Sequence, residues 1–413
     1  MRAHRLKRVL LDTAPLRLDR DFRWLWTGQA INGVGSQITR LALPYQVYVL
    51  TNSTLAIAAL TLFQLLPILV FSLGAGSIAD AVDRRRMLRI TQLGLMACSL
   101  FLAILAFQPS VPLPLLFLVA FASAAFASLD QPARSSAIPR LVPRERLPAA
   151  IALGQLNFQI ASVVGPTLAG LVIAGAGIGW VYAVNAVSFL MVIVALLLMR
   201  VRPRVGLPES VTITWAAAKE GLHFVFSQPI VRSTMLLDFI ATFFASATAL
   251  LPIFAQDILR VGARGYGWLY AAPSIGAVVA GFITAHTVDR IERRGAVLLW
   301  SVAAYGAATV VFGLSRSFAL TLLCLAGVGA ADTVSTVIRN IIRQLETPDE
   351  LRGRMTGVNM MFFMGGPQLG ELEAGVTAQF LGATFSVVSG GLGCLAATGA
   401  VAWREQRLRQ YRR

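Results

Sequence analysis

Charge is scarce in this chain of 413 residues. Asp, Glu, Lys and Arg make up only 14% of it, whereas 56% of the residues are hydrophobic, and this balance argues against a soluble globular protein. Cysteine is also rare: Cys98, Cys324 and Cys394 stand alone inside apolar runs. We therefore expect them to be packing residues, with neither a disulfide framework nor a metal site.

The signatures of catalysis are missing as well. The three histidines, His4, His223 and His286, lie far apart, and neither a Gly-x-Ser-x-Gly nor a His-Glu-x-x-His motif occurs. The sequence also has no Walker motif and no Gly-x-Gly-x-x-Gly turn, which argues against ATP as a direct energy source. We expect neither an enzyme nor a bound cofactor.

Long apolar runs dominate instead. A bilayer core requires about 20 predominantly apolar residues per helix, and twelve stretches of this chain meet that requirement. They are residues 22–50, 54–80, 86–107, 112–135, 147–174, 178–199, 230–257, 265–287, 294–314, 317–342, 352–378 and 380–403. The predicted fold class is an all-α polytopic membrane protein with twelve transmembrane helices.

Basic residues are distributed unevenly around these spans. All of the 36 lysines and arginines except Arg40, Arg260, Arg264 and Arg316 lie in the termini or beside connections on one side of the membrane. The positive-inside rule assigns that side to the cytoplasm, so we expect both termini there, in a bacterial inner membrane. The net charge of +16 is then a topology signal, and nucleic-acid binding is not expected. The basic, amphipathic residues 1–21 are predicted to lie on the membrane surface.

Short sequences recur in the two halves of the chain. Leu43-Pro44 returns as Leu251-Pro252, Gly165-Pro166 as Gly366-Pro367, and Asp130 as Asp332. Such a repeat predicts two pseudo-symmetric six-helix bundles, a common construction of secondary transporters. The expected parts are a first bundle at 1–199, a cytoplasmic linker at 200–229, and a second bundle with a basic tail at 230–413.

The connection between the second and third spans carries a known pattern. The sequence G-x-[LI]-A-D-x-x-x-R-R is formed here by Gly76, Ile78, Ala79, Asp80, Arg84 and Arg85. It resembles the signature of the major facilitator superfamily, and FRWLWTGQAINGVGSQI and GGPQLGELEAG are similar to its enterobactin-exporter-like branch. This resemblance implies a monomeric transporter that exports a siderophore, a drug or another secondary metabolite by alternating access. A multidrug pump without a siderophore role and an uptake symporter of the same fold remain alternatives.

Two of these motifs have both a functional and a structural interpretation. Asp80 is predicted to form a gating contact with Arg84, Arg85 and the start of the eleventh span, where residues 347–350 (TPDE) resemble a capping box. The alternative is a solvated anchor. In the fifth span, GPTLAG resembles the antiporter motif of drug exporters, and close helix packing is the alternative role of its residues Gly165, Pro166 and Gly170.

Ionisable residues inside the spans indicate a polar interior, because a charge near the bilayer centre costs about 3 kcal/mol or more without a cavity or partner. Stripes at helical spacing give six candidates for the substrate cavity: Gln29, Asn32, Ser36, Arg40, Thr234 and Thr242. The candidates for proton coupling are Asp238, Asp332, Asp130, Glu371 and Glu373.

We expect Asp238 to carry the driving proton and Arg40 to attract an anionic part of the cargo. Asp130 and Asp332 have a structural alternative, since Arg134 and Arg339 on their own helices can pair with them. The predicted function is therefore export of a small amphipathic molecule by proton antiport. One proton crossing ~100 mV supplies ~2.3 kcal/mol for this purpose.

Overall fold

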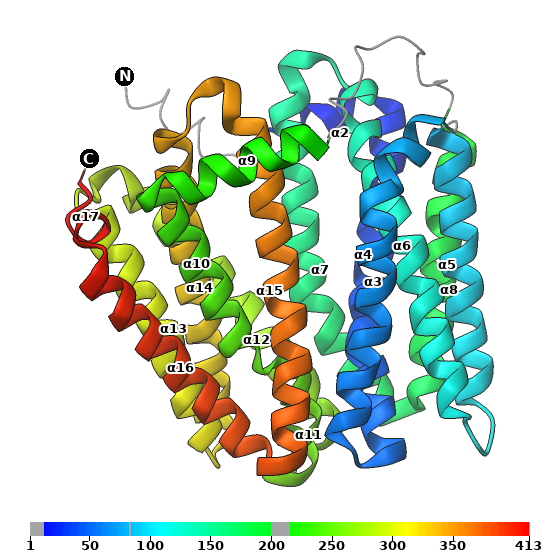
Figure 1. Cartoon of the computed structure of the whole chain (residues 1–413). Helices are drawn as coiled ribbons and strands as arrows, with labels where there is room; N and C mark the ends of the chain where they lie inside the picture. The colour runs from blue at the N-terminus through cyan, green and yellow to red at the C-terminus, as the bar shows by residue number, and fades with distance from the viewer. Residues whose placement is uncertain (1–11, 82–83, 200–214, 413) are drawn as a thin grey trace. The chain divides into compact units, whose positions relative to one another are not determined.

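The computed structural model describes residues 12–81, 84–199 and 215–412. Every regular element in these ranges is a helix and none is a strand (Figure 1). Each of the twelve predicted spans corresponds to a helical segment whose ends lie within a few residues of the predicted ones. The all-α prediction is confirmed.

Nine helical segments among the described residues are long and apolar enough to cross a membrane. The other predicted spans are also long helices: α3 (Arg20–Thr51), α4 (Thr54–Ala81) and α15 (Arg352–Leu381). These three helices do not meet the same requirement for two reasons. Polar residues interrupt the apolar sequence of α3 and α15, and the part of α4 whose side chains are described, Thr54–Val70, is shorter than a full span.

One compact unit contains residues 1–43 and 63–212. Besides most of α3 and the second part of α4, its helices are α2 (Ala14–Leu18), α5 (Arg84–Ala106), α6 (Leu113–Leu141), η1 (Arg144–Arg146), α7 (Leu147–Ala176) and α8 (Ile178–Leu198). Helix α5 packs against α6 and α8, and α7 packs against α6 and α8. Apolar side chains such as Leu25, Ala133 and Val192 form a core between these helices.

The other compact unit contains residues 44–62, at the corner between α3 and α4, and residues 213–413. Its further elements are α9 (Trp215–Ser227), α10 (Pro229–Phe244), η2 (Ala247–Leu250), α11 (Leu251–Ile253), η3 (Phe254–Ile258), α12 (Gly262–Thr287), η4 (Val288–Arg290), α13 (Arg294–Leu314), α14 (Phe318–Glu346), η5 (Asp349–Leu351), α15, α16 (Ala383–Arg404) and α17 (Gln406–Arg409). Helix α13 lies between α14 and α16, and α10 packs on α15 and α16.

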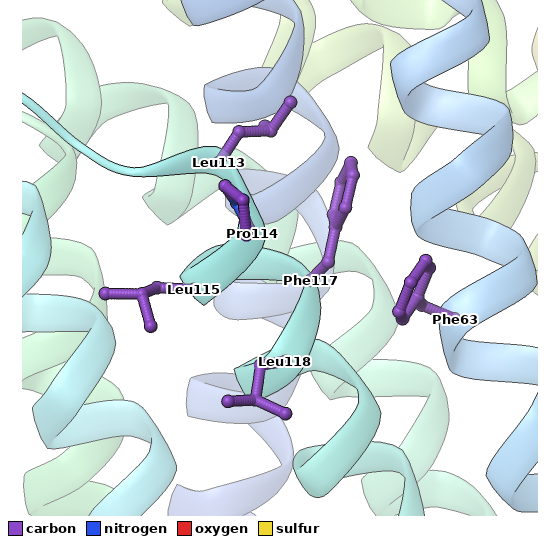
Figure 2. A pocket seen from close by; sticks show the side chains of 6 residues that line it. All are labelled: Phe63, Leu113, Pro114, Leu115, Phe117 and Leu118. Carbon is purple, nitrogen blue, oxygen red and sulfur yellow. The ribbon is translucent and has the colours of Figure 1, made fainter.

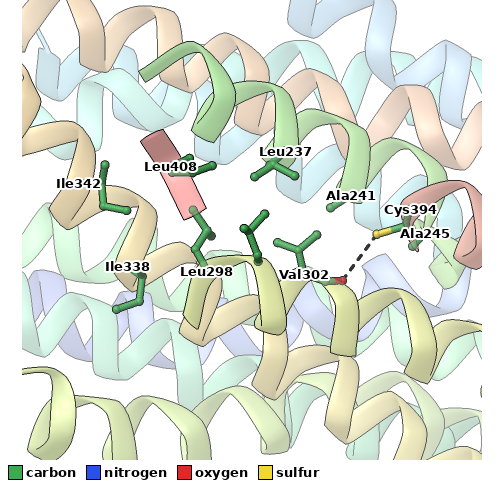
Figure 3. Packing of buried hydrophobic residues seen from close by; sticks show 10 residues of the cluster. Leu237, Ala241, Ala245, Leu298, Val302, Ile338, Ile342, Cys394 and Leu408 are labelled. Atoms are coloured by element: carbon green, nitrogen blue, oxygen red, sulfur yellow. Dashed lines mark hydrogen bonds between the residues drawn. The ribbon is translucent and has the colours of Figure 1, made fainter. Parts of the chain in front are cut away.

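The core of this second unit joins four long helices and the short α17 (Figure 3). Leu237, Leu298 and Ile338 come from α10, α13 and α14, and each is 1% exposed or less. Cys394 of α16 is fully buried and its Sγ lies 3.8 Å from the carbonyl oxygen of Val302. All three cysteines are free, and the place of Cys394 agrees with the predicted packing role.

The seventh span is broken, whereas the sequence predicted one helix at 230–257. Helix α10 ends at Phe244, and a 3-10 turn, a single α-turn and the π-helix η3 follow. Pro252 explains part of the break, because its nitrogen has no hydrogen with which to continue an α-helical ladder. Side chains satisfy nearby groups: Tyr305 donates to the carbonyl of Ala245 at 3.3 Å, and Ser246 donates to that of Pro367 at 3.2 Å. Irregular backbone at membrane depth requires such partners.

Candidate functional site

Three charged side chains from two helices meet inside the second unit. Asp238 of α10 lies 2.8 Å from Arg339 and 3.5 Å from Arg343, both on α14, measured between carboxylate and guanidinium atoms. None of the three side chains is more than 3% exposed. The two arginines stand one helical turn apart, as do Thr234 and Asp238, so the polar stripes of the two packed helices face each other.

Arg343 of α14 is held by hydrogen bonds that it donates to two other helices. Its Nε donates to Thr234 Oγ1 at 3.2 Å and its Nη2 donates to the Thr234 carbonyl at 2.9 Å. Its Nη1 donates to Asn359 of α15. This arginine therefore has a fixed position between α10, α14 and α15.

Arg339 is shared between two carboxylates. Besides Asp238, it pairs with Asp332 on its own helix at 3.7 Å, and it donates to the hydroxyls of Ser335 and Thr336 at 3.0 and 2.8 Å. Its contact with Asp238 Oδ1 is an ion pair that lacks hydrogen-bond geometry, and its buried Nε has no hydrogen-bond partner among the described residues. The Asp332 side chain is 45% exposed, in contrast to 3% for Asp238.

The two acids and two arginines together form a formally neutral group, which we call the shared-arginine cluster (Asp238, Asp332, Arg339, Arg343). Neutrality matters because a single unpaired charge is costly at membrane depth. Removing one partner from a buried pair typically costs 3–5 kcal/mol. The cluster thus stabilises the unit as a set, while Asp332 is its one accessible member.

The sequence predicted part of this arrangement. It predicted that Arg339 can pair with Asp332 on the same helix, but it named no arginine of α14 as a partner of Asp238. Arg232, on the same helix as Asp238, pairs with Glu405 at 3.3 Å. The sequence does contain a signal for this contact. Polar residues stand one helical turn apart both on α10 (Thr234, Asp238) and on α14 (Arg339, Arg343), so the two polar stripes can face each other.

Asp130 of α6 has a different environment in the first unit. Its carboxylate is fully buried, and one oxygen accepts hydrogen bonds from Thr91 and Gln92 of α5, both at 2.8 Å. Its other oxygen pairs with Arg134, one turn along α6. All of these contacts lie within one unit, which agrees with the structural alternative for this residue.

The polar stripe of α3 divides into a buried and an accessible part. Asn32 is 5% exposed and donates to Ser188 of α8 at 3.2 Å, and Ser36 lies 3.5 Å from Asn32. Gln29 is partly exposed and Arg40 is exposed. Arg40 has no ion-pair partner among the described residues, so it remains available for an anion.

The other predicted residues of the second unit are partly buried. Thr242 of α10 donates to the carbonyl of Asp238 at 2.8 Å. Glu373 of α15 accepts a hydrogen bond from Thr377 at 2.6 Å. Glu371 is partly buried as well, and the helical spacing places these two glutamates on different faces of α15.

The predicted gating residues Gly76, Asp80, Arg84 and Arg85 have side chains outside the described part of the structure, and their role stays a prediction. The capping box predicted at residues 347–350 is wrong. The hydroxyl of Thr347 donates to the carbonyl of Arg343 at 2.6 Å, so it satisfies the end of α14 and not the start of the next helix. The following 3-10 turn has no side-chain cap.

Gly165 of α7 and its repeat Gly366 of α15 mark the same close packing in both units. A Cβ on Gly165 would lie 2.6 Å from Cβ of Gln37 on α3. A Cβ on Gly366 would lie 2.4 Å from Oγ1 of Thr242 on α10. Gly170, like Gly165 and Pro166, is buried. These positions support the packing interpretation of the GPTLAG motif, as small residues let helices approach closely.

A group of polar contacts that the sequence did not predict surrounds the π-helix η3. Tyr48 donates to the carboxylate of Asp257, Gln256 donates to the hydroxyl of Tyr45, and the rings of Tyr45 and Tyr266 stack with centroids 5.3 Å apart. A π-helix often marks a functional position. The spacing of Tyr45 and Tyr48, about one turn apart on α3, was the available signal.

An apolar hollow of about 380 Å³ lies in the first unit (Figure 2). Phe63 of α4 and the first turns of α6 line it, and Phe63 stacks on Phe117 with centroids 5.3 Å apart. All six lining residues are apolar. No polar group is present there to orient a cargo, as binding sites usually require.

Comparisons with known proteins agree with this architecture. The model of a family described as "Transmembrane secretion effector" matches residues 12–412. The chain is 27% identical over 386 residues to the enterobactin exporter EntS of Shigella boydii serotype 18 and 26% identical to that of Escherichia coli O81, covering 94% of this chain and 92% of each relative.

Solved structures show the same fold at low sequence identity. A bacterial homologue of the iron transporter ferroportin, in an inward-facing state, superposes with a TM-score of 0.72 at 16% identity, covering 94% of this chain and 100% of that one. A POT family transporter in complex with 5-aminolevulinic acid superposes with a TM-score of 0.74 at 13% identity, covering 94% and 97%.

Proposed function

Because the chain belongs to the transmembrane secretion effector family of the major facilitator superfamily, we propose that it exports a small amphipathic organic molecule across the bacterial cytoplasmic membrane in exchange for protons. The family makes it a multi-pass membrane transporter of small molecules and not an enzyme, as the sequence predicted.

The proposed cargo is a siderophore of the catecholate type. The support is that curated relatives named as enterobactin exporters align with nearly the whole chain. A drug or other secondary metabolite is the second candidate cargo, since one fold serves many cargoes. The exposed Arg40 is the proposed contact for an anionic group of the cargo.

The observation that carries the proposed coupling is the sharing of Arg339 between Asp238 and Asp332. A proton on Asp332 removes one negative charge, which leaves Arg339 to Asp238 alone. Release of that proton restores the competition for the guanidinium group. Since Asp238 lies on α10 and Arg339 on α14, each cycle changes the attraction between two helices that pack together.

Exposure divides the roles of the two acids. Asp332 is reachable, so we assign proton exchange to it. Asp238, which the sequence favoured as the carrier, is enclosed by two arginines and has the surroundings of a fixed counter-ion. Asp130, Glu371 and Glu373 remain further candidates. We also propose a monomer with both termini in the cytoplasm, on the basis of the basic residues described above.

Transport by inside-out membrane vesicles tests this assignment. Labelled enterobactin is the first cargo and a cationic dye is the second, and both are measured with an imposed proton gradient and in counterflow without one. Asp332→Asn is expected to keep counterflow and to lose gradient-driven accumulation. Asp289→Asn, at an exposed residue of η4, is the matched control and should keep both.

Each result distinguishes a part of the proposal. If gradient-driven accumulation persists in Asp332→Asn but disappears in Asp238→Asn, proton exchange would be assigned to Asp238 instead. Accumulation unaffected by both changes would rule out coupling through this cluster. Transport of the dye but not of enterobactin would identify a drug exporter.

A further inference from the structure

A polar hollow of about 470 Å³ lies at one end of the second unit. The first turn of α10 and the corner between α16 and α17 form it. The residues that line it are Pro229, Arg232, Arg404, Glu405, Gln406 and Arg407. Three of the six are arginines, and none of them belongs to the shared-arginine cluster.

The corner that carries these arginines is firmly held. Leu408 of α17 is 1% exposed and packs into the core beside Leu298 (Figure 3). The backbone N–H of Gly295 donates to the carbonyl of Tyr411 at 3.2 Å, and Tyr411 donates to Glu346 at 2.8 Å. A Cβ at Gly295 would lie only 1.7 Å from the carbonyl oxygen of Leu408, so this close contact requires glycine.

The charges around the hollow are not balanced. Arg232 and Glu405 pair at 3.3 Å and neutralise each other. Arg404 and Arg407 are exposed and have no ion-pair partner in the part of the chain that the structure describes. The hollow therefore presents two guanidinium groups without an opposite charge, on a backbone that is packed and hydrogen-bonded to the rest of the unit.

The position of the hollow relative to the bilayer is indicated by Trp403. This side chain is 80% exposed and precedes Arg404 at the end of a membrane-spanning helix. Tryptophan is enriched at the level of the lipid headgroups, where its ring is in contact with both apolar and polar surroundings. The adjacent arginines are thus expected at the depth of lipid phosphates.

We propose that this hollow binds the phosphate group of an anionic phospholipid, such as phosphatidylglycerol or cardiolipin. A guanidinium group matches a phosphate with two parallel hydrogen bonds, and basic pockets at the ends of membrane helices are suited to anionic headgroups. Glu405 lies in the same hollow and competes for Arg232, so it weakens the site. The proposal does not depend on the cargo or on proton coupling.

Lipid binding to the purified full-length protein tests this proposal. Native mass spectrometry would compare phosphatidylglycerol with phosphatidylcholine of the same acyl chains. We expect retention of phosphatidylglycerol by the wild type, and roughly thirtyfold weaker retention by the double variant Arg404→Gln, Arg407→Gln. The double variant Arg409→Gln, Arg412→Gln removes the same charge from the same tail outside the hollow and should bind like the wild type.

One further variant and one competition experiment test the same proposal independently. Glu405→Gln frees Arg232 and is expected to strengthen retention several-fold, which gives a test even if the double variant does not fold. Inorganic phosphate is expected to compete only weakly with the lipid, and full competition would identify a site for soluble anions instead. Equal loss in both double variants, or equal binding of phosphatidylcholine, would overturn the proposal and leave only general attraction to the membrane surface.

Discussion

Asp130 in the first unit and Asp332 in the second are related by the sequence repeat, yet their surroundings differ. Asp130 is fully buried, and its two oxygens accept from Thr91, Gln92 and Arg134. Asp332 is 45% exposed and shares the arginine of another acid. An acid with fixed partners fastens helices together, whereas an accessible acid with a shared partner can change its charge without leaving other groups unpaired.

The largest effect is expected from removing the shared arginine. Arg339→Met removes the cation that two acids share and leaves the cluster with one excess negative charge, because only Arg343 remains beside Asp238. It should lower the free energy of unfolding by about 3–5 kcal/mol. Arg134→Met in the first unit should cost only about 1–2 kcal/mol, because Thr91 and Gln92 still bind the carboxylate. Thermal unfolding in detergent measures both.

A neutral replacement provides the control for that prediction. The double variant Asp238→Asn, Arg339→Gln removes both charges together, and we expect it to regain much of the stability lost in Arg339→Met. Equal losses in Arg339→Met and Arg134→Met would mean that the two acids are held alike.

Substitutions that disturb helix packing, unlike those that remove a charge, should reduce stability by similar amounts in both units. Gly165→Ala and Gly366→Ala each place a methyl group against a side chain of the neighbouring helix, and each should cost about 1–3 kcal/mol. Gly154→Ala on α7 and Gly365→Ala on α15 meet no atom within 4 Å, so they should be neutral or slightly stabilising. Unfolding temperatures of the four variants test this, and a cost confined to one unit would contradict it.

Exchange of each related acid for its amide should separate their roles. Asp130→Asn loses its ion pair with Arg134 and should reduce stability by about 1–2 kcal/mol, with transport per folded molecule unchanged. Asp332→Asn should reduce stability by about 1 kcal/mol or less, because its ion pair is partly exposed and Arg339 keeps Asp238 as a partner, and it should abolish gradient-driven transport. Measuring unfolding and transport on the same preparations checks both parts, and a reversed pattern would exchange the two assignments.

The loss of a single hydrogen bond should have a smaller effect than the loss of Arg339 or of the close helix packing, and the bond concerned has no described counterpart in the first unit. Tyr48→Phe removes the hydrogen bond to Asp257 and should cost about 1 kcal/mol. A double-mutant cycle with Asp257→Asn measures the coupling between the two side chains. Strictly additive losses would show that this contact contributes nothing.

The sequence predicted the helices well, because apolar length is a requirement that each span must meet by itself. It did not predict the break after Phe244, since the partners that make it tolerable, Tyr305 and Pro367, come from other helices. It predicted Asp332–Arg339, which is local in sequence, but not the partners of Asp238, which depend on how α10 meets α14. The mistaken cap at Thr347 has a similar cause, because its hydroxyl can serve either the preceding or the following helix.

The buried Leu408 has a practical consequence for handling the protein. A chain shortened to the end of α16 would lose the Leu408 side chain, which packs beside Leu298 in the core. It would also lose the backbone of residues 408–411, which lies against Gly295. An affinity tag attached after the last residue of the chain would leave Leu408 in place in the core. A chain that ends before Gln406 would have a cavity in the core of the second unit where Leu408 packs.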